Sequence, residues 1–282
     1  MGCRVTEAEA QRSRRARAAA ELALVRIVHQ YGGRPEFVLL GGLVPHLLCP
    51  GAEIPHAGTT DVDVQVDLEI AGGAVNTARL ETALRNADFG PDGERTWRWE
   101  ATPGGSHVII KFELLADLDD QPAGASVNFD DCERLGAANL RGTGYAARDA
   151  HVLELSAKDG GVLRTVEVCV TGLAGFLLAK TAAAYGRRKP KDWYDIAYVL
   201  LYNEAGGVAA AVDTVRATFR GQLAPARAAL VDLAANFADE GAQGPNAYVA
   251  QVMADDPSLD PAMAATDAVL AVTRFCELLR EP

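Results

Sequence analysis

Residues 37–68 read FVLLGGLVPHLLCPGAEIPHAGTTDVDVQVDL, and this stretch is the most informative about the fold. A short apolar run at 37–40 ends at Gly41-Gly42, after which apolar residues return at helical spacing. Beyond a loop rich in Pro and Gly, residues 60–68 alternate polar and apolar side chains with a period of two, as a strand does. The polar face of this predicted strand carries Asp61, Asp63, Gln65 and Asp67. The stretch therefore predicts a strand, a glycine turn, a helix and an acidic strand.

Other strands and helices are predicted on both sides of this stretch. Residues 106–115 alternate again, with Lys111 and Glu113 on the polar face. Further strands are expected at 126–129 and 164–170, and helices at 6–30 and 76–87. Apart from 126–129, residues 116–149 follow no clear pattern.

Helices dominate the chain after residue 171. Thr171 is the expected N-cap of a helix over 172–185, and Gly186 is its expected end. Four more helices are predicted at 193–202, 208–219, 224–237 and 262–279. Because strands cluster before residue 171 and helices after it, we predict an α+β protein. A small mixed β-sheet flanked by helices would occupy residues 1–170, and a helical domain residues 171–282.

Asp61 and Asp63 lie two residues apart on one strand, so both carboxylates project from the same face. Two like charges at this spacing repel each other unless a cation lies between them, and Mg²⁺ is the hard cation that such oxygens prefer. An ion held in this way suits phosphoryl or nucleotidyl transfer. Glu113 is the candidate third ligand, with Asp117 as the alternative. An Asp-x-Asp pattern alone is also typical of a solvent-facing strand end.

A second group of charged residues lies in the predicted helical domain. Lys180 is on a mostly apolar helix, where an ammonium either reaches out to solvent or binds a nucleotide phosphate. The densest basic run of the chain consists of Arg187, Arg188, Lys189 and Lys191. Asp192 is expected to compensate the dipole of the next helix. Asp195 is expected to face inward, where it would hold a basic side chain or assist proton transfer from an attacking hydroxyl.

Together these residues resemble the nucleotidyltransferase superfamily, and within it the AbiEii/AbiGii (MenT-type) toxins of bacterial abortive-infection and toxin–antitoxin systems. The similarity covers residues 37–66, 111–115 and 171–201, under half of the chain. These segments hold the Gly-Gly turn with a Thr-x-Asp-x-Asp motif, the third acidic strand, and a lysine helix with a basic-Asp-x-x-Asp motif. Ala57 departs from the family, which often has Arg there, and Gly42 stands where many members have Ser. His56 is a candidate substitute for that Arg.

The resemblance implies a nucleotidyltransferase fold and a metal-dependent transfer of NMP from NTP, with release of pyrophosphate. The implied ligands of Mg²⁺ or Mn²⁺ are Asp61, Asp63 and Glu113. The implied catalytic residues are Asp61, Asp63, Lys180 and Asp195. The implied nucleotide-binding residues are Gly41, Gly42, Thr60, Lys180, Arg187, Lys189 and Lys191. The expected acceptor is an RNA such as a tRNA 3′ end, and the expected protein partner is an antitoxin encoded nearby.

Two other functions stay open at this point. A nucleotidyltransferase with the same site would instead modify a hydroxyl of an antibiotic or of a protein. A chain that lacks turnover would only bind a nucleotide or a partner protein, and Ala57 in place of the family's Arg favours this alternative.

The composition is that of a globular protein, with 282 residues, 49% hydrophobic and 23% charged. A formal net charge of −11 argues against a surface that binds nucleic acid everywhere. Residues 177–191, however, carry five basic and no acidic side chains, so an RNA partner would contact a small basic region. Five widely spaced Cys argue against a zinc site or a disulfide framework. No apolar run reaches the ~20 residues of a membrane span, and we expect a cytoplasmic protein without a membrane partner.

Overall fold

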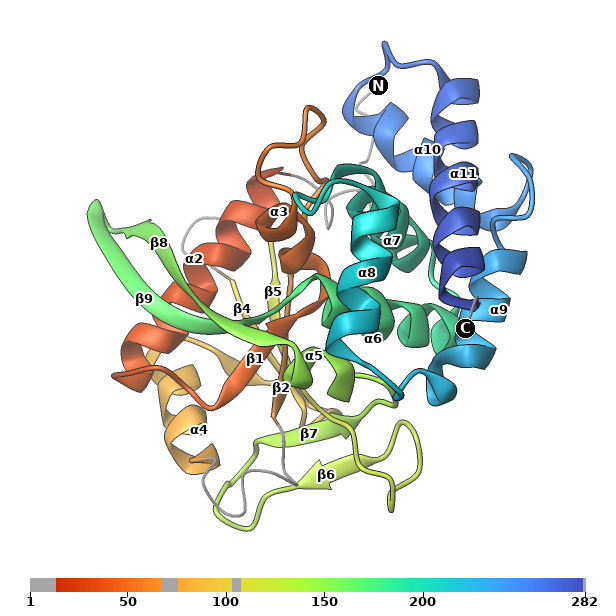
Figure 1. The fold of residues 1–282 in the computed structure, drawn as a ribbon. Helices are drawn as coiled ribbons and strands as arrows, with labels where there is room; N and C mark the ends of the chain where they lie inside the picture. The colour runs from red at the N-terminus through yellow and green to blue at the C-terminus, as the bar shows by residue number, and fades with distance from the viewer. Residues whose placement is uncertain (1–13, 67–75, 103–107, 281–282) are drawn as a thin grey trace. The chain divides into compact units, whose positions relative to one another are not determined.

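The computed structural model describes residues 14–66, 76–102 and 108–280 as a mixed α/β protein that divides into two compact units (Figure 1). Unit 1 comprises Met1–Val44 and Gly58–Thr171, and unit 2 comprises Pro45–Ala57 and Gly172–Pro282. The boundary between Thr171 and Gly172 lies one residue beyond the domain boundary expected after residue 170. The assignment of Pro45–Ala57 to unit 2 has no counterpart in the sequence analysis, which placed it in the first domain.

Unit 1 is built on an open, mixed β-sheet that has nine strands among the described residues. Its main path runs in the order β3 (Gly90–Pro91), β4 (Arg98–Ala101), β5 (Ile110–Ala116), β2 (Asp61–Val66), β1 (Phe37–Leu40), β9 (Val162–Thr171) and β8 (Ala150–Asp159). On a side branch, β7 (Gly136–Asn139) pairs with β5, and β6 (Ser126–Asn128) pairs with β7. The sheet is mixed because β2 is antiparallel to β1 but parallel to β5, and β1 is parallel to β9.

Five of these strands match the segments predicted from the sequence, with ends that differ by up to four residues: β1, β2, β5, β6 and β9. Residues 97–103 are expected from the sequence to be a loop or an edge strand, and the structure places β4 there, between β3 and β5. The sequence analysis did not include β8, β3 or β7. Three parts of its predicted elements lie outside the described residues, namely 6–13 of the first helix, 67–68 of the acidic strand and 106–107 of the strand with Glu113.

The longest described helix of unit 1, α2 (Arg14–Tyr31), packs against α4 (Thr77–Asn86) and the β8–β9 hairpin. Its buried residues recur every three or four positions and include Ala16, Ala20, Ala23 and Ile27. Asn76 is the N-cap of α4, because its side chain accepts a hydrogen bond from the Arg79 N–H at 2.8 Å. The remaining helical turns of unit 1 are η1 (Gly41–Leu43) and α5 (Gly144–Arg148), whereas α3 (Val44–Leu48) belongs to unit 2 from Pro45 onward.

The part of unit 2 after residue 172 is helical. Its elements are α6 (Leu173–Arg187), α7 (Pro190–Tyr202), α8 (Val208–Thr218), η2 (Ala224–Ala226), α9 (Arg227–Ala235), α10 (Gln243–Asp255) and α11 (Pro261–Arg280). The central helix is α7, which packs against α6, α10 and α11. It is buried along 192–200, so its side chains form the core of this unit.

Two sequence predictions for the start and end of α6 are wrong, and one helix of unit 2 was not predicted. Thr171 is not the N-cap of α6, because Gly172 takes that position and no side chain caps the helix. Gly186 does not end α6, which closes instead at Arg188 with a left-handed φ of 48°. The sequence analysis missed α10 because Gly244 and Pro245 look like helix breakers, although Pro is tolerated in a first turn, where its missing N–H has no helical partner.

Candidate functional site

The acidic residues of unit 1 lie on two neighbouring parallel strands. In the register of β2 and β5, Asp61 is level with Lys111 and Asp63 is level with Glu113. Positions that are level in parallel strands project to the same face of the sheet, so Asp61, Asp63 and Glu113 share one face. All three residues are half-buried. The sheet therefore brings the predicted acidic residues together.

The Gly-Gly turn packs directly on this acidic face. Gly41 has a φ of +78°, and a Cβ on it would lie 2.7 Å from Cγ of Asp63 and closer still to its carboxylate. A Cβ on Gly42 would lie 2.9 Å from Cβ of Thr59. The hydroxyl of Thr59 in turn accepts a hydrogen bond from the Asp61 N–H at 3.0 Å. Glycine is thus required at both positions because neighbouring side chains leave no space for a Cβ, and at Gly41 also because of the positive φ.

Glu113 has a partner that the sequence analysis did not find. Arg98 lies opposite Glu113 in the antiparallel strand β4 and donates to Oε1 from Nε at 2.8 Å and from a terminal nitrogen at 2.5 Å. The Glu113 carboxylate, which was expected to complete a metal site, is therefore bound to Arg98. Within the described ranges, no group of three His, Cys, Asp or Glu side chains is placed to hold a metal ion.

A set of two carboxylates still fits Mg²⁺. This ion usually binds one or two protein carboxylates and fills its other positions with water and substrate phosphates. Asp61 and Asp63 on one strand face make such a set. Glu113 does not fit as a third ligand while Arg98 holds it.

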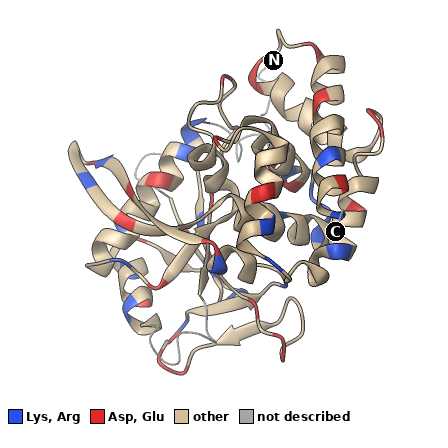
Figure 2. Ribbon diagram, in the orientation of Figure 1, with Lys and Arg blue, Asp and Glu red and all other residues tan. Residues whose placement is uncertain are grey.

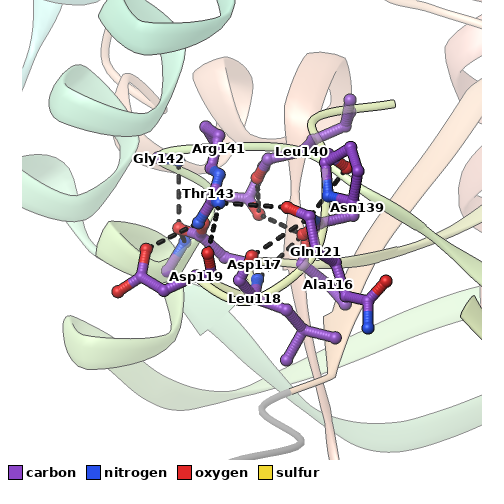
Figure 3. A network of polar contacts seen from close by, with 12 residues as sticks. Ala116, Asp117, Leu118, Asp119, Gln121, Asn139, Leu140, Arg141, Gly142 and Thr143 are labelled. Atoms are coloured by element: carbon purple, nitrogen blue, oxygen red, sulfur yellow. Dashed lines mark hydrogen bonds and ion pairs between the residues drawn. The ribbon is translucent and has the colours of Figure 1, made fainter. Parts of the chain in front are cut away.

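Asp117, the alternative third ligand, also has hydrogen-bond partners within the protein. Its Oδ2 accepts hydrogen bonds from the backbone N–H groups of Gly142 and Gly144 at 3.0 and 2.9 Å (Figure 3). Asn139 fixes the same loop, since its buried amide donates to three carbonyl oxygens and accepts from the Leu118 N–H. The Asp117 carboxylate thus ties the loop after β5 to the turn before α5.

Thr60 does not share the acidic face. It directly precedes β2 and has the parity of Val62 and Val64, which are fully buried. Its own side chain is buried, and its hydroxyl has no hydrogen-bond partner among the described residues. The strand alternation therefore directs Thr60 toward the core side of the sheet.

Unit 2 contains a chain of polar and charged side chains, buried except for the exposed Arg187, which we call the ion chain: His56, Asp195, Lys180, Asp192 and Arg187. The Lys180 ammonium lies 2.9 Å from Oδ2 of Asp195 and 3.3 Å from Oδ1 of Asp192. Its side chain is only 5% exposed, so Lys180 does not reach out to solvent. Arg187 closes one end with two contacts of 2.7 Å to the Asp192 carboxylate.

Asp192 is more than a residue that compensates a helix dipole. It does lie in the first turn of α7, but its side chain is fully buried between Lys180 and Arg187. Burial favours the neutral carboxyl, yet the two cations outweigh burial and hold the pKa of Asp192 below its ordinary value. The sequence signal for this role is the spacing of 12 between Lys180 and Asp192 on two helices joined by a tight turn.

His56 closes the other end of the ion chain. Its Nε2 lies 3.0 Å from Oδ1 of Asp195, so this nitrogen carries the proton, and its ring packs between Tyr194 and Tyr198. The Tyr194 hydroxyl accepts from the Ala57 N–H at 3.1 Å, and the Tyr198 hydroxyl donates to a backbone carbonyl of the same segment at 2.8 Å. The segment 45–57 is thus fixed to α7 by polar contacts.

The basic run does not act as one surface. Arg187 belongs to the ion chain, and Arg188 pairs with Asp232 of α9. Lys189 is exposed and Lys191 is half-buried. Of the predicted nucleotide-binding side chains in unit 2, the structure brings Lys180 and Arg187 together through Asp192.

Neither protein-family models nor curated proteins nor solved structures give a match to this chain. Among the described residues, no helix combines the length and the apolar character that crossing a membrane needs.

Proposed function

We propose that this protein is a metal-dependent nucleotidyltransferase that transfers NMP from NTP to an RNA acceptor. One observation carries the proposal most: the Gly41-Gly42 turn leaves no space for a Cβ beside the carboxylate of Asp63, on the strand face that also holds Asp61. A glycine backbone that lies against one carboxylate of the acidic pair suits a triphosphate and its metal ion, since phosphates approach glycine backbone closely.

In this proposal Asp61 and Asp63 hold Mg²⁺ or Mn²⁺. The ion would neutralise triphosphate charge and lower the pKa of the attacking hydroxyl. Lys180 is the phosphate-binding ammonium, and its contacts with two carboxylates fix the position of its side chain. Asp195 orients or deprotonates the acceptor, and its contact with His56 fixes the direction of its carboxylate.

The acceptor and the biological role rest on the family resemblance. The proposed acceptor is a tRNA 3′ end, whose modification would block charging and growth, and the proposed partner is an antitoxin encoded nearby.

Labelled nucleotides test the proposal directly. The purified protein is incubated with each of the four α-labelled NTPs, Mg²⁺ and total RNA, and the products are resolved on a gel. We expect labelled RNA with the native protein, and no label with Asp61→Asn or after chelation of the metal. Asp213→Asn is the matched control, because Asp213 is an exposed residue of α8 and should label RNA normally. Labelling by Asp61→Asn at the native level would refute the assignment.

A second candidate function is nucleotide binding without turnover. The ion pair between Arg98 and Glu113 favours it, because it engages one of the three carboxylates expected to hold the metal. Calorimetry with NTP and Mg²⁺, combined with an assay of pyrophosphate release, separates the two functions. Binding without release in the presence of RNA, protein and small-molecule acceptors would support the second.

A further inference from the structure

The β8–β9 hairpin ends the sheet of unit 1 with an unusually regular edge. β8 pairs with β9 over ten consecutive residue pairs without a bulge, from Ala150–Thr171 to Asp159–Val162. Among the described residues, no strand pairs with the other edge of β8. The hairpin runs out beyond α2 (Figure 1). Natural proteins protect such an edge with charged side chains, a bulge, a proline or a covering element. β8 carries charged side chains but has no bulge and no proline.

The backbone groups on the open edge belong to the even-numbered residues. Gly160 and Gly161 both have positive φ, which is typical of a type I′ turn, and such a turn is closed by a hydrogen-bonded pair, here Asp159–Val162. Hydrogen-bonded and non-hydrogen-bonded pairs alternate along an antiparallel ladder. Odd-numbered residues of β8 therefore bond to β9. The outward N–H and C=O groups are those of Val152, Glu154, Ser156 and Lys158.

The side chains of these four residues form an exposed strip, which we call the edge strip. All four are exposed, and Val152 retains 43% of its accessible surface. Figure 2 shows both signs of charge on the hairpin. Within the hairpin, Glu154 lies opposite Glu167, which places like charges side by side, and Lys158 lies opposite Leu163. Neither Glu154 nor Lys158 has an ion-pair partner in the described part of the chain.

We propose that the edge strip pairs antiparallel with the edge strip of a second copy of this chain. Only even-numbered residues can exchange hydrogen bonds across the new ladder, which leaves few registers. In the register centred on Ser156, Glu154 lies opposite Lys158 of the second copy, and two-fold symmetry makes this pair twice. The same register places Leu155 opposite Ala157 of the second copy on the other face. A register centred on Glu154 would instead oppose two identical carboxylates.

The charge pattern therefore selects both the occupant and the register. Each Glu154, beside Glu167 in its own hairpin, gains a cation, and each Lys158 gains a carboxylate. A partner with a uniformly basic or acidic edge would satisfy only one of the two residues. A second copy satisfies both.

Sedimentation over protein concentrations of about 1 to 100 μM, the range of weak homodimers, measures the association. We expect a monomer–dimer equilibrium for the native chain. Glu154→Lys and Lys158→Glu should each weaken the dimer by about tenfold or more, because each change turns two attractions into repulsions. The double variant Glu154→Lys with Lys158→Glu should restore it. Glu53→Lys, an equal charge change at an exposed position of unit 2, should have no effect.

A second pair of variants tests the backbone contact and the register. Ser156→Pro removes an outward N–H and the exposed side-chain hydrogen bond between Ser156 and Thr165 of β9, but no backbone bond to β9. The hairpin should therefore stay folded by circular dichroism while the dimer is lost. Under oxidation Ser156→Cys should form a disulfide-linked dimer, since opposed residues of a hydrogen-bonded pair have Cα atoms about 5.5 Å apart. Lys158→Cys should not.

Three results would overturn the proposal. The first is a native chain that stays monomeric over the whole concentration range. The second is a double charge variant that associates no better than the single ones. The third is a Ser156→Pro chain that still forms the native dimer, which would place the interface elsewhere.

Discussion

Replacing Lys180 with Met removes the ammonium at the centre of the ion chain and keeps a side chain of similar shape. Its two contacts, 2.9 Å to Asp195 and 3.3 Å to Asp192, are both buried, so water cannot replace the lost cation. Arg187 still balances Asp192. Asp195 keeps its contact with His56.

The size of the effect follows from burial. Removing one partner of a buried ion pair costs about 3–5 kcal/mol, because an uncompensated charge stays in the interior. The apolar end of Met regains on the order of 1 kcal/mol. We therefore expect the free energy of unfolding of unit 2 to fall by about 2–4 kcal/mol, a large part of the stability of a typical domain.

Urea unfolding followed by tryptophan fluorescence measures this loss. Trp193 lies in α7 beside Asp192 and reports on unit 2, whereas Trp97 and Trp99 lie in unit 1. Comparison with Trp193→Phe identifies the part of the signal that belongs to unit 2. At a slope of about 1–3 kcal/mol per molar urea, the midpoint of the unit 2 transition should fall by roughly 1–2 M.

Lys189→Met is the matched control, because Lys189 is an exposed lysine of the same unit. It should change the free energy of unfolding by no more than about 0.5 kcal/mol. If Lys180→Met also unfolds within about 1 kcal/mol of the native chain, the ammonium does not balance the two carboxylates and the reasoning is wrong.

Three further variants extend the test. Asp192→Asn should destabilise unit 2 near pH 7 but less near pH 3. The pKa of Asp192 is lower in the folded state than its unfolded value of about 3.9, so the carboxylate stabilises the fold above about pH 3.9, and this contribution is lost as the pH falls through the folded pKa. Equal losses at both pH values in urea unfolding would contradict this. Gly41→Ala should lower the free energy of unfolding by about 1–2 kcal/mol from its positive φ alone, and it should displace the Asp63 carboxylate. We expect a lower thermal midpoint and, under the proposed function, no RNA labelling. Asp117→Ala should cost about 1–3 kcal/mol by leaving two N–H groups of the 142–144 turn unpaired, and an unchanged thermal midpoint would show that water satisfies them.

The elements that the sequence predicts well are those with a clear local period. The alternation over 60–68 and the glycine turn at 41–42 correspond to β2 and η1, and the acidic residues share one face as their spacing requires. The helices α7, α8 and α11 follow from the apolar spacing of their residues. Local pattern is enough here because strand and helix periods alone decide which side chains face inward.

The features that the sequence does not predict depend on contacts between distant residues. Arg98 meets Glu113 only because β4 and β5 adopt one particular register. His56 meets Asp195 across 139 residues, and although the sequence predicts that Asp195 faces inward and holds a basic side chain, it does not identify His56 as its partner. These pairs alter the candidate site more than any secondary-structure boundary does, since one removes an expected metal ligand and the other fixes the carboxylate proposed to act on the acceptor.

The placement of residues 45–57 has a consequence for synthesis and for the design of truncated proteins. The chain leaves unit 1 at Pro45 and returns at Gly58, and the helix that the excursion needs, α7, is made more than a hundred residues later. On the ribosome this segment must wait for its partner, so unit 2 cannot complete its fold until α7 has been made, and long-range closure of this kind slows folding. A fragment ending at Thr171 would carry an orphaned loop with His56 and its apolar neighbours in water. An expressible version of unit 1 therefore requires a short linker in place of 45–57, and an expressible version of unit 2 requires that segment to be grafted onto it.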